Sequence, residues 1–267
     1  MADLSLALPH PILVLPAAAA GGYLAYRLHL LTRSGALTAT AFGLCLLAFG
    51  GAAWFWLAMA FFIPTSLLSR VGRARKADAE ARVEKGSRRD AGQVLANGGV
   101  AWLMLGLYAV SPETAFLWGF VGAFSAAAAD TWATELGGLA RAEPRLITTG
   151  RRVPAGTSGG VTWGGSLGAC AGAIWMGAAG GMLGLLPVLG VAAVGMGGVA
   201  GAFADSLLGA TAQALYRDQR GNTTERPAAA SERVRGWDWV TNDVVNVAAT
   251  AVGAAVGAGL GLAWGGS

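Results

Sequence analysis

The sequence predicts an all-α membrane protein, a polytopic bundle of about eight (seven to nine) transmembrane helices with a polar pocket open to the cytoplasmic side. The 267-residue chain has a mean hydropathy of +0.52, and only 13% of its residues are charged. Soluble domains carry about a quarter charged residues. Its 42 glycines come without a comparable excess of proline, and small residues let membrane helices pack closely. We therefore expect one integral membrane domain, residues 1–267, embedded in a lipid bilayer.

Apolar segments alternate with polar ones along the whole chain. Most are long enough for the ~20 residues that a helix needs to cross a bilayer. The predicted spans cover 12–31, 36–50, 53–69, 92–110, 114–140, 160–180, 187–215 and 240–264. The second and third are short, and we interpret them as two crossings joined at Gly50-Gly51. A single bent segment there would change the count by one and reverse the N-terminal topology.

Basic residues predict the orientation of this bundle. With eight crossings, all 19 Lys and Arg residues fall on one side of the membrane. By the positive-inside rule that side is cytoplasmic, so both termini are expected outside, in a bacterial-type inner membrane. Three cytoplasmic loops follow from this assignment: a basic loop at 70–91, a Gly/Arg-rich loop at 141–159 and a third loop at 216–238.

The N-terminus and the cysteines add two exclusions. The N-terminal segment lacks the basic region expected at the start of a signal peptide and carries the acidic Asp3 instead. We therefore interpret it as a retained first span. Cys45 and Cys170 both fall within predicted spans, which supports neither a disulfide framework nor a Cys-based metal site. His10 and His29 lie far from the polar motifs, so a His-rich zinc site is not expected.

Ionisable residues enter the spans only in the second part of the chain. Asp130 lies eleven residues before Arg141, and Asp205 lies twelve before Arg217. Asp243 lies a few residues into the last span, so all three acids are expected in the cytoplasmic half. Because such groups are costly in a bilayer and normally face a bundle interior or a wet cavity, one shared pocket is predicted.

Asp130 and Glu135 form the first candidate pair. At 100° per residue they lie about 140° apart on a straight helix, so sharing one ion requires a bend, an unwound turn or a bridging water. Gly137-Gly138 could provide the bend. Carboxylates with few sulfur ligands suit a hard cation such as Mg²⁺.

A second motif precedes the sixth span. In "RLITTGRRVPAGTSGGVTWGG", Arg145, Arg151 and Arg152 come before the turn formed by residues 156–160. Free backbone N–H groups, small residues and the positive end of a helix favour phosphate binding, and Arg adds bidentate contacts. The alternative is a flexible loop whose glycines serve helix packing. The motif does not match Walker A.

A third motif, "WDWVTNDVVNVAAT", opens the last span. Asn242, Asp243 and Asn246 either join helices by hydrogen bonds or provide oxygen ligands for a second cation, with Asp205 and Ser206 as partners. Together, hard-cation ligands and phosphate donors in a membrane pocket indicate phosphoryl transfer between a nucleotide and a phosphate-bearing lipid. No nucleic-acid partner is expected.

Five motifs in order, "KGSRRDAGQVLANGGVA", "ADTWATELG", "PRLITTGRRVPAGTSGGVT", "ADSLLGATAQ" and "NDVVN", resemble the integral membrane family that contains phytyl-phosphate kinase and the animal transmembrane protein 19. The resemblance runs from about Arg33 to the C-terminus. It implies phosphoryl transfer, from CTP, to an isoprenyl monophosphate such as phytyl or geranylgeranyl phosphate. A more distant similarity to dolichol kinase, phytol kinase and phosphatidate cytidylyltransferase is also implied.

The resemblance assigns roles by motif. Metal and catalytic roles fall to Asp130, Glu135, Asp205 and Asp243. Phosphate and nucleotide contacts fall to Lys85, Arg89, Asn97, Arg145, Arg152, Thr157, Ser158, Gly159, Gly160, Ser206, Asn242 and Asn246. Many family members carry cysteines before "NDVVN"; this chain has none there, although Glu225 matches.

Two other functions remain open on sequence grounds. One is an ion or lipid transporter or flippase that uses the same acidic pocket, and the other is a cytidylyltransferase that forms a CDP-lipid. The glycine- and alanine-rich faces permit a homodimer but do not require one.

Overall fold

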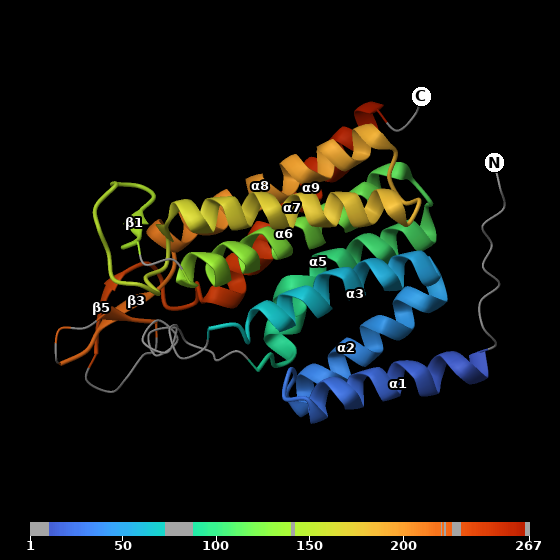
Figure 1. Cartoon of the computed structure of the whole chain (residues 1–267), viewed down its shortest axis with the longest axis horizontal. Helices are drawn as coiled ribbons and strands as arrows, with labels where there is room; N and C mark the ends of the chain where they lie inside the picture. The colour runs from blue at the N-terminus through green and yellow to red at the C-terminus, as the bar shows by residue number, and fades with distance from the viewer. Residues whose placement is uncertain are drawn as a thin grey trace.

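The computed structural model describes residues 11–72, 88–139, 142–219, 221, 223–225 and 231–264 (Figure 1). Within these residues the chain forms eight α-helices. They are α1 (Pro11–Arg27), α2 (Arg33–Cys45), α3 (Ala52–Leu68), α5 (Ala91–Val110), α6 (Thr114–Leu139), α7 (Trp163–Met182), α8 (Val188–Thr211) and α9 (Asn242–Trp264). A π-helical segment, η1 (Leu46–Gly50), continues α2.

These helices match the eight predicted segments one for one. The predicted break at Gly50-Gly51 is confirmed, because η1 ends there and Gly51 adopts φ +79°, a conformation that glycine tolerates best. Within the described ranges, four helical stretches are long and apolar enough to cross a bilayer by length and composition: residues 33–50, α5, α8 and α9. The count of eight crossings stays a prediction. The apolar helix α3 is shorter.

Side-chain caps explain where several helices begin. Thr32 accepts a hydrogen bond from the Gly35 N–H at 3.1 Å at the start of α2. Asp90 and Gln93 form a capping box at the start of α5, with bonds of 2.9 and 3.1 Å. Thr162 accepts from Gly165 N at 3.0 Å and begins α7. Each cap satisfies N–H groups that the first helical turn leaves without partners.

Helix α6 occupies the centre of the bundle and contacts α3, α5, α7, α8 and α9 (Figure 1). Residues 118–129 of α6 are all buried. Glycines line its contacts with neighbouring helices. A Cβ added at Gly122 of α6 would lie 2.3 Å from Gly253 O of α9, and one at Gly172 of α7 would lie 2.7 Å from Ala128 O of α6. The glycines therefore let the neighbouring helices pack directly on the α6 backbone.

Five short strands gather at one end of the bundle (Figure 1). Strand β1 (Arg145–Leu146) pairs with β2 (Gly160–Val161), and β3 (Leu215–Arg217) lies between β4 (Thr223–Thr224) and β5 (Glu232–Arg235), all antiparallel. They belong to the two predicted loops at 141–159 and 216–238 and their flanks. Helix α1 begins, and α9 ends, at the opposite end of the bundle. The described part of the 70–91 loop comprises only 70–72 and 88–91.

Candidate functional site

The carboxyl groups of Asp130 and Asp205 face each other across the packed surfaces of α6 and α8, within hydrogen-bonding reach. The Oδ2 atom of Asp205 is buried and has no hydrogen-bond partner in the described structure. Two carboxylates at this distance require a shared proton or a cation between them, because like charges repel strongly in a low dielectric. The pair is thus the strongest candidate for ion binding among the predicted residues.

The glycine-rich loop lies one helical turn from Asp205. Asp205 and Gly209 are spaced i,i+4 on α8, so both lie on one face of that helix. A Cβ added at Gly209 would lie 2.9 Å from Gly159 N, and one at Gly159 would lie 2.5 Å from the Ala210 backbone N. Gly159 also adopts φ +78°. Glycine is thus required on both sides for the loop to rest on α8.

Two residues from the third loop hold Ser158 in place. The Ser158 hydroxyl donates a hydrogen bond to Oε1 of Glu225, a carboxylate that is only 8% exposed. The Arg235 guanidinium donates to Ser158 O at 3.2 Å and to Gly209 O at 2.6 Å. Glu225 also acts electrostatically on both Asp205 and Arg235. Burial lowers the pKa of Arg235, and the Glu225 charge opposes that shift.

Glu135 lies elsewhere, which corrects its predicted role as a ligand beside Asp130. Helix α6 runs unbroken through Gly137-Gly138, so the two carboxylates stay about 140° apart around its axis. Glu135 acts instead on the Arg89 guanidinium. Arg89 donates to Thr65 Oγ1 at 3.4 Å and lies 5.7 Å from the centre of the Phe61 ring.

Arg89 therefore joins α3, α6 and the start of α5. Burial lowers its pKa, and Glu135 opposes the shift. Its backbone carbonyl accepts from Thr32 N at 2.9 Å, and its N–H donates to Leu30 O at 3.1 Å. These contacts fix the segment onto the turn between α1 and α2. The structure gives Arg89 these packing contacts, and its place at a ligand entrance stays a prediction.

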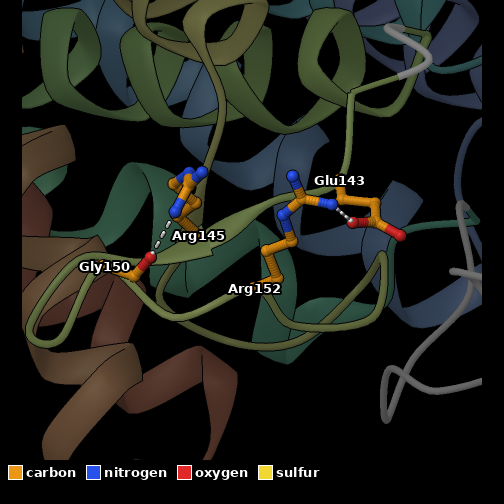
Figure 2. Close-up of polar contacts among 4 residues, drawn as sticks. All are labelled: Glu143, Arg145, Gly150 and Arg152. Carbon is orange, nitrogen blue, oxygen red and sulfur yellow. Dashed lines mark hydrogen bonds and ion pairs between the residues drawn. The ribbon is translucent and has the colours of Figure 1, made fainter.

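The predicted phosphate-binding arginines Arg145 and Arg152 are exposed and bond within their own loop (Figure 2). Arg145 donates to Gly150 O at 2.9 Å, and Arg152 forms an ion pair with Glu143 at 2.9 Å. An exposed ion pair is worth at most about 1 kcal/mol. Both guanidinium groups can therefore exchange these partners for a phosphate at small cost.

The other predicted residues are spread around this end. Thr157 donates to Pro154 O at 2.7 Å within its turn, and Asn97 donates to Gln93 O at 3.0 Å within α5. Ser206 follows Asp205 on α8, Gly160 begins β2, and Asn242 and Asp243 begin α9 one turn before Asn246. Lys85 lies outside the described residues.

A four-carboxylate metal site does not form. Among the described residues, no three His, Cys, Asp or Glu side chains lie close enough to hold one ion. The Asp130–Asp205 pair alone still fits Mg²⁺, which usually takes one or two carboxylates and completes its shell with water and substrate phosphates. The buried Asp205 Oδ2 without a partner is the oxygen such an ion would use.

A separate apolar groove of about 750 Å³ lies between α7 and α8. Met196 and Phe203 line it and are 53% and 58% exposed. Phe203 lies about 160° around α8 from Asp205, so the groove faces away from the carboxylate pair. It is distinct from the polar pocket that the sequence predicts.

Sequence reasoning missed Arg235, and it assigned no role to Gln213 or Glu225. Glu225 and Arg235 belong to a loop whose strand pairing has no clear sequence signal. Gln213 carried a signal, since an amide near the end of an apolar span is unusual. Its side chain is 2% exposed, and its Nε2 has no partner in the described structure.

The bundle of long apolar helices is that of an integral membrane protein, with an ionisable pair between two of its helices. The chain belongs to the DUF92 family of integral membrane proteins, which it matches over residues 16–254. It is similar to Protein PGR of Arabidopsis thaliana, 32% identical over 71% of this chain and 75% of the relative.

Two further relatives are uncharacterized membrane proteins. One, from Methanocaldococcus jannaschii, is 37% identical over 67% of this chain and 74% of the relative. The other, from Synechocystis, is 29% identical over 76% of this chain and 71% of the relative. No solved structure matches the chain.

Proposed function

We propose that the protein is a membrane-embedded, Mg²⁺-dependent kinase that transfers a phosphoryl group from a nucleotide, CTP by family resemblance, to an isoprenyl monophosphate. The observation that carries the proposal is the Asp130–Asp205 pair, one helical turn from a loop that presents Ser158 and Gly159. The resemblance to phytyl-phosphate kinase supplies the substrate class.

The charged side chains around Asp205 favour binding of a cation together with phosphate groups. Asp205 experiences the charges of both Asp130 and Glu225, and Glu225 in turn acts on one guanidinium, that of Arg235, so three carboxylates accompany one cation. A divalent ion would neutralise the carboxylates and let phosphate groups approach. In phosphoryl transfer, most of the catalytic effect comes from such positioning and charge neutralisation.

The proposed reaction transfers the γ-phosphoryl group of the nucleotide to the phosphate of the lipid. An oxygen of the isoprenyl monophosphate attacks the γ-phosphorus of CTP, the bond from that phosphorus to the β–γ bridging oxygen breaks, and CDP leaves with the electron pair. A monophosphate is ionised at pH 7, so no general base is needed. Asp130 and Asp205 would hold the ion, and Ser158 and the loop N–H groups would hold phosphate oxygens. The ion, when bound, supplies charge stabilisation in the transition state.

Two alternative functions predict a different product or no product. A cytidylyltransferase would release pyrophosphate and form a CDP-lipid. A transporter or flippase would favour ionisable groups through the full membrane depth, whereas Asp130 and Asp205 both lie in the C-terminal halves of α6 and α8, which lead to β1 and β3.

Mass spectrometry of products tests the proposal. The full chain in lipid nanodiscs is incubated with Mg²⁺, one of four nucleotides, and phytyl, geranylgeranyl or farnesyl monophosphate. We expect an isoprenyl diphosphate and a nucleoside diphosphate in equal amounts, and loss of both with EDTA. Pyrophosphate and a CDP-lipid would indicate the cytidylyltransferase. No product with any pair of substrates would overturn the kinase.

A further inference from the structure

We propose that Gln213 and Arg235 form a phosphate-binding subsite beside Ser158, at the end of α8. The inference rests on the proposed function and deepens it. The Asp130–Asp205 pair would hold the cation, while this second group of side chains would hold a phosphoryl group of one of the two substrates.

Gln213 is the first observation. Its side chain is 2% exposed, and its Nε2 donor has no partner in the described structure. A buried amide without a hydrogen bond is costly, so native structures rarely keep one without a ligand or water. The Gln213 backbone is fixed, because its N–H donates to Leu208 O at 3.0 Å and Gly236 packs against its carbonyl.

Arg235 is the second observation. One guanidinium nitrogen bonds Ser158 O and Gly209 O, but the buried Nε atom has no partner in the described part of the chain. Guanidinium donors are suited to phosphate oxygens. The Gln213 Nε2 and the Arg235 Nε are thus two buried N–H donors without a hydrogen-bond partner in the described structure.

Gly209 brings these groups to one place. A Cβ at Gly209 would lie 2.9 Å from Gly159 N, 3.4 Å from Ser158 C and 3.5 Å from Gln213 Oε1. The Gln213 amide, the loop backbone and the Arg235 guanidinium therefore surround one glycine. A phosphate oxygen accepts from several such donors at once. Asp205 and Gly209 lie one helical turn apart on α8, about 6 Å along its axis, so the cation would bind one turn from the glycine that these donors surround.

The subsite is tested by comparing ligand binding between the unaltered protein and a variant at Gln213. Affinity for inorganic pyrophosphate, Mg²⁺–CTP and geranylgeranyl monophosphate is measured by titration calorimetry on the full chain in nanodiscs. Gln213→Glu replaces the donor by a carboxylate of the same shape and should weaken phosphate binding about ten- to a hundredfold. Thr211→Ala is the matched control, since this exposed hydroxyl bonds only its own helix, at Leu207 O.

The two phosphate sources are separated by kinetics. A higher KM for CTP alone assigns the subsite to the nucleotide, and a higher KM for the isoprenyl phosphate alone assigns it to the acceptor. Unchanged affinity for all three probes in a folded Gln213→Glu protein overturns the subsite. If turnover persists in that case, the proposed function stands without it. If pyrophosphate binding depends on Gln213 but no substrate pair gives product, the subsite stands and the proposed function fails.

A second measurement covers a variant that does not fold. Hydrogen exchange on the unaltered protein is compared with and without pyrophosphate and Mg²⁺. We expect slower exchange at residues 158–160 and 213–214. Equal exchange there at saturating ligand overturns the proposal independently of any substitution.

Discussion

The Ser158 hydroxyl donates a hydrogen bond to the carboxylate of Glu225, 67 residues further along the chain. This contact joins the glycine-rich loop to the β3–β4–β5 region, and Arg235 strengthens the junction by bonding Ser158 O and Gly209 O. Three segments separated in sequence therefore meet at the end of α8. The position of the loop relative to Asp205 depends on this junction.

Removing the Glu225 side chain should destabilise the junction. Glu225→Ala leaves the Ser158 hydroxyl without this acceptor and Arg235 without a nearby opposite charge. We expect the free energy of unfolding to fall by about 1–3 kcal/mol, measured as a lower Tm in nanodiscs. Glu225→Gln should lose less, because the amide still accepts from Ser158. Glu232→Ala, at an exposed position of β5, is the control; a Tm for Glu225→Ala equal to that of the control would contradict the contact.

The two carboxylates on α6 should behave differently. Asp130→Asn removes a proposed ion ligand and should lower kcat at least about 100-fold, because a bound metal ion contributes several kcal/mol to the transition state. Glu135→Gln should keep most of the activity and lower Tm, since Glu135 acts on Arg89. Rates at increasing Mg²⁺ check the assignment: only Asp130→Asn should need more Mg²⁺. The reverse pattern would make Glu135 the ligand.

The helices and their order could be predicted from the sequence because apolar length reports directly on span position. The break at Gly51 was also readable, since two adjacent glycines end a helix easily. The same reasoning failed at Gly137-Gly138, where α6 stays helical. There, Gly137 packs against Gly165 and Thr162 of the next helix start, so tertiary contact outweighs the weak helix propensity of glycine.

The site was predictable only in part, for a physical reason. Asp130 and Asp205 are ionisable groups in apolar spans, and their cost in a bilayer identifies them. Glu225 and Arg235 lie in a polar loop, where charged residues are ordinary. Glu225 follows β4 and Arg235 ends β5, so the antiparallel pairing of both strands with β3 positions these two side chains. That pairing cannot be derived from composition or spacing.

The α6–α9 crossing provides a test of packing. Gly122 and Gly253 approach so closely that a Cβ at Gly253 would lie 2.5 Å from Gly122 O. Gly253→Ala must push the two helices apart, with an expected cost of about 1–3 kcal/mol for overpacking. Gly259→Ala lies on the same helix with nothing within 4 Å of the added Cβ, so it should be neutral or slightly stabilising. Equal Tm values for the two variants would contradict the close crossing.

The orientation in the membrane is testable by cysteine labelling. Residues 145–152 and the other described basic loops lie at the strand-bearing end of the bundle, and the α5–α6 turn lies at the opposite end (Figure 1). By the positive-inside rule the strand-bearing end should be cytoplasmic. In a background with Cys45→Ala and Cys170→Ala, we introduce Thr149→Cys or Glu113→Cys, both at exposed positions. A membrane-impermeant maleimide should label the Glu113→Cys protein in intact cells, and the Thr149→Cys protein only after permeabilisation. The opposite labelling would place the carboxylate pair on the outer side, where cytoplasmic nucleotides cannot reach it, and would remove the physical basis for a CTP-dependent reaction.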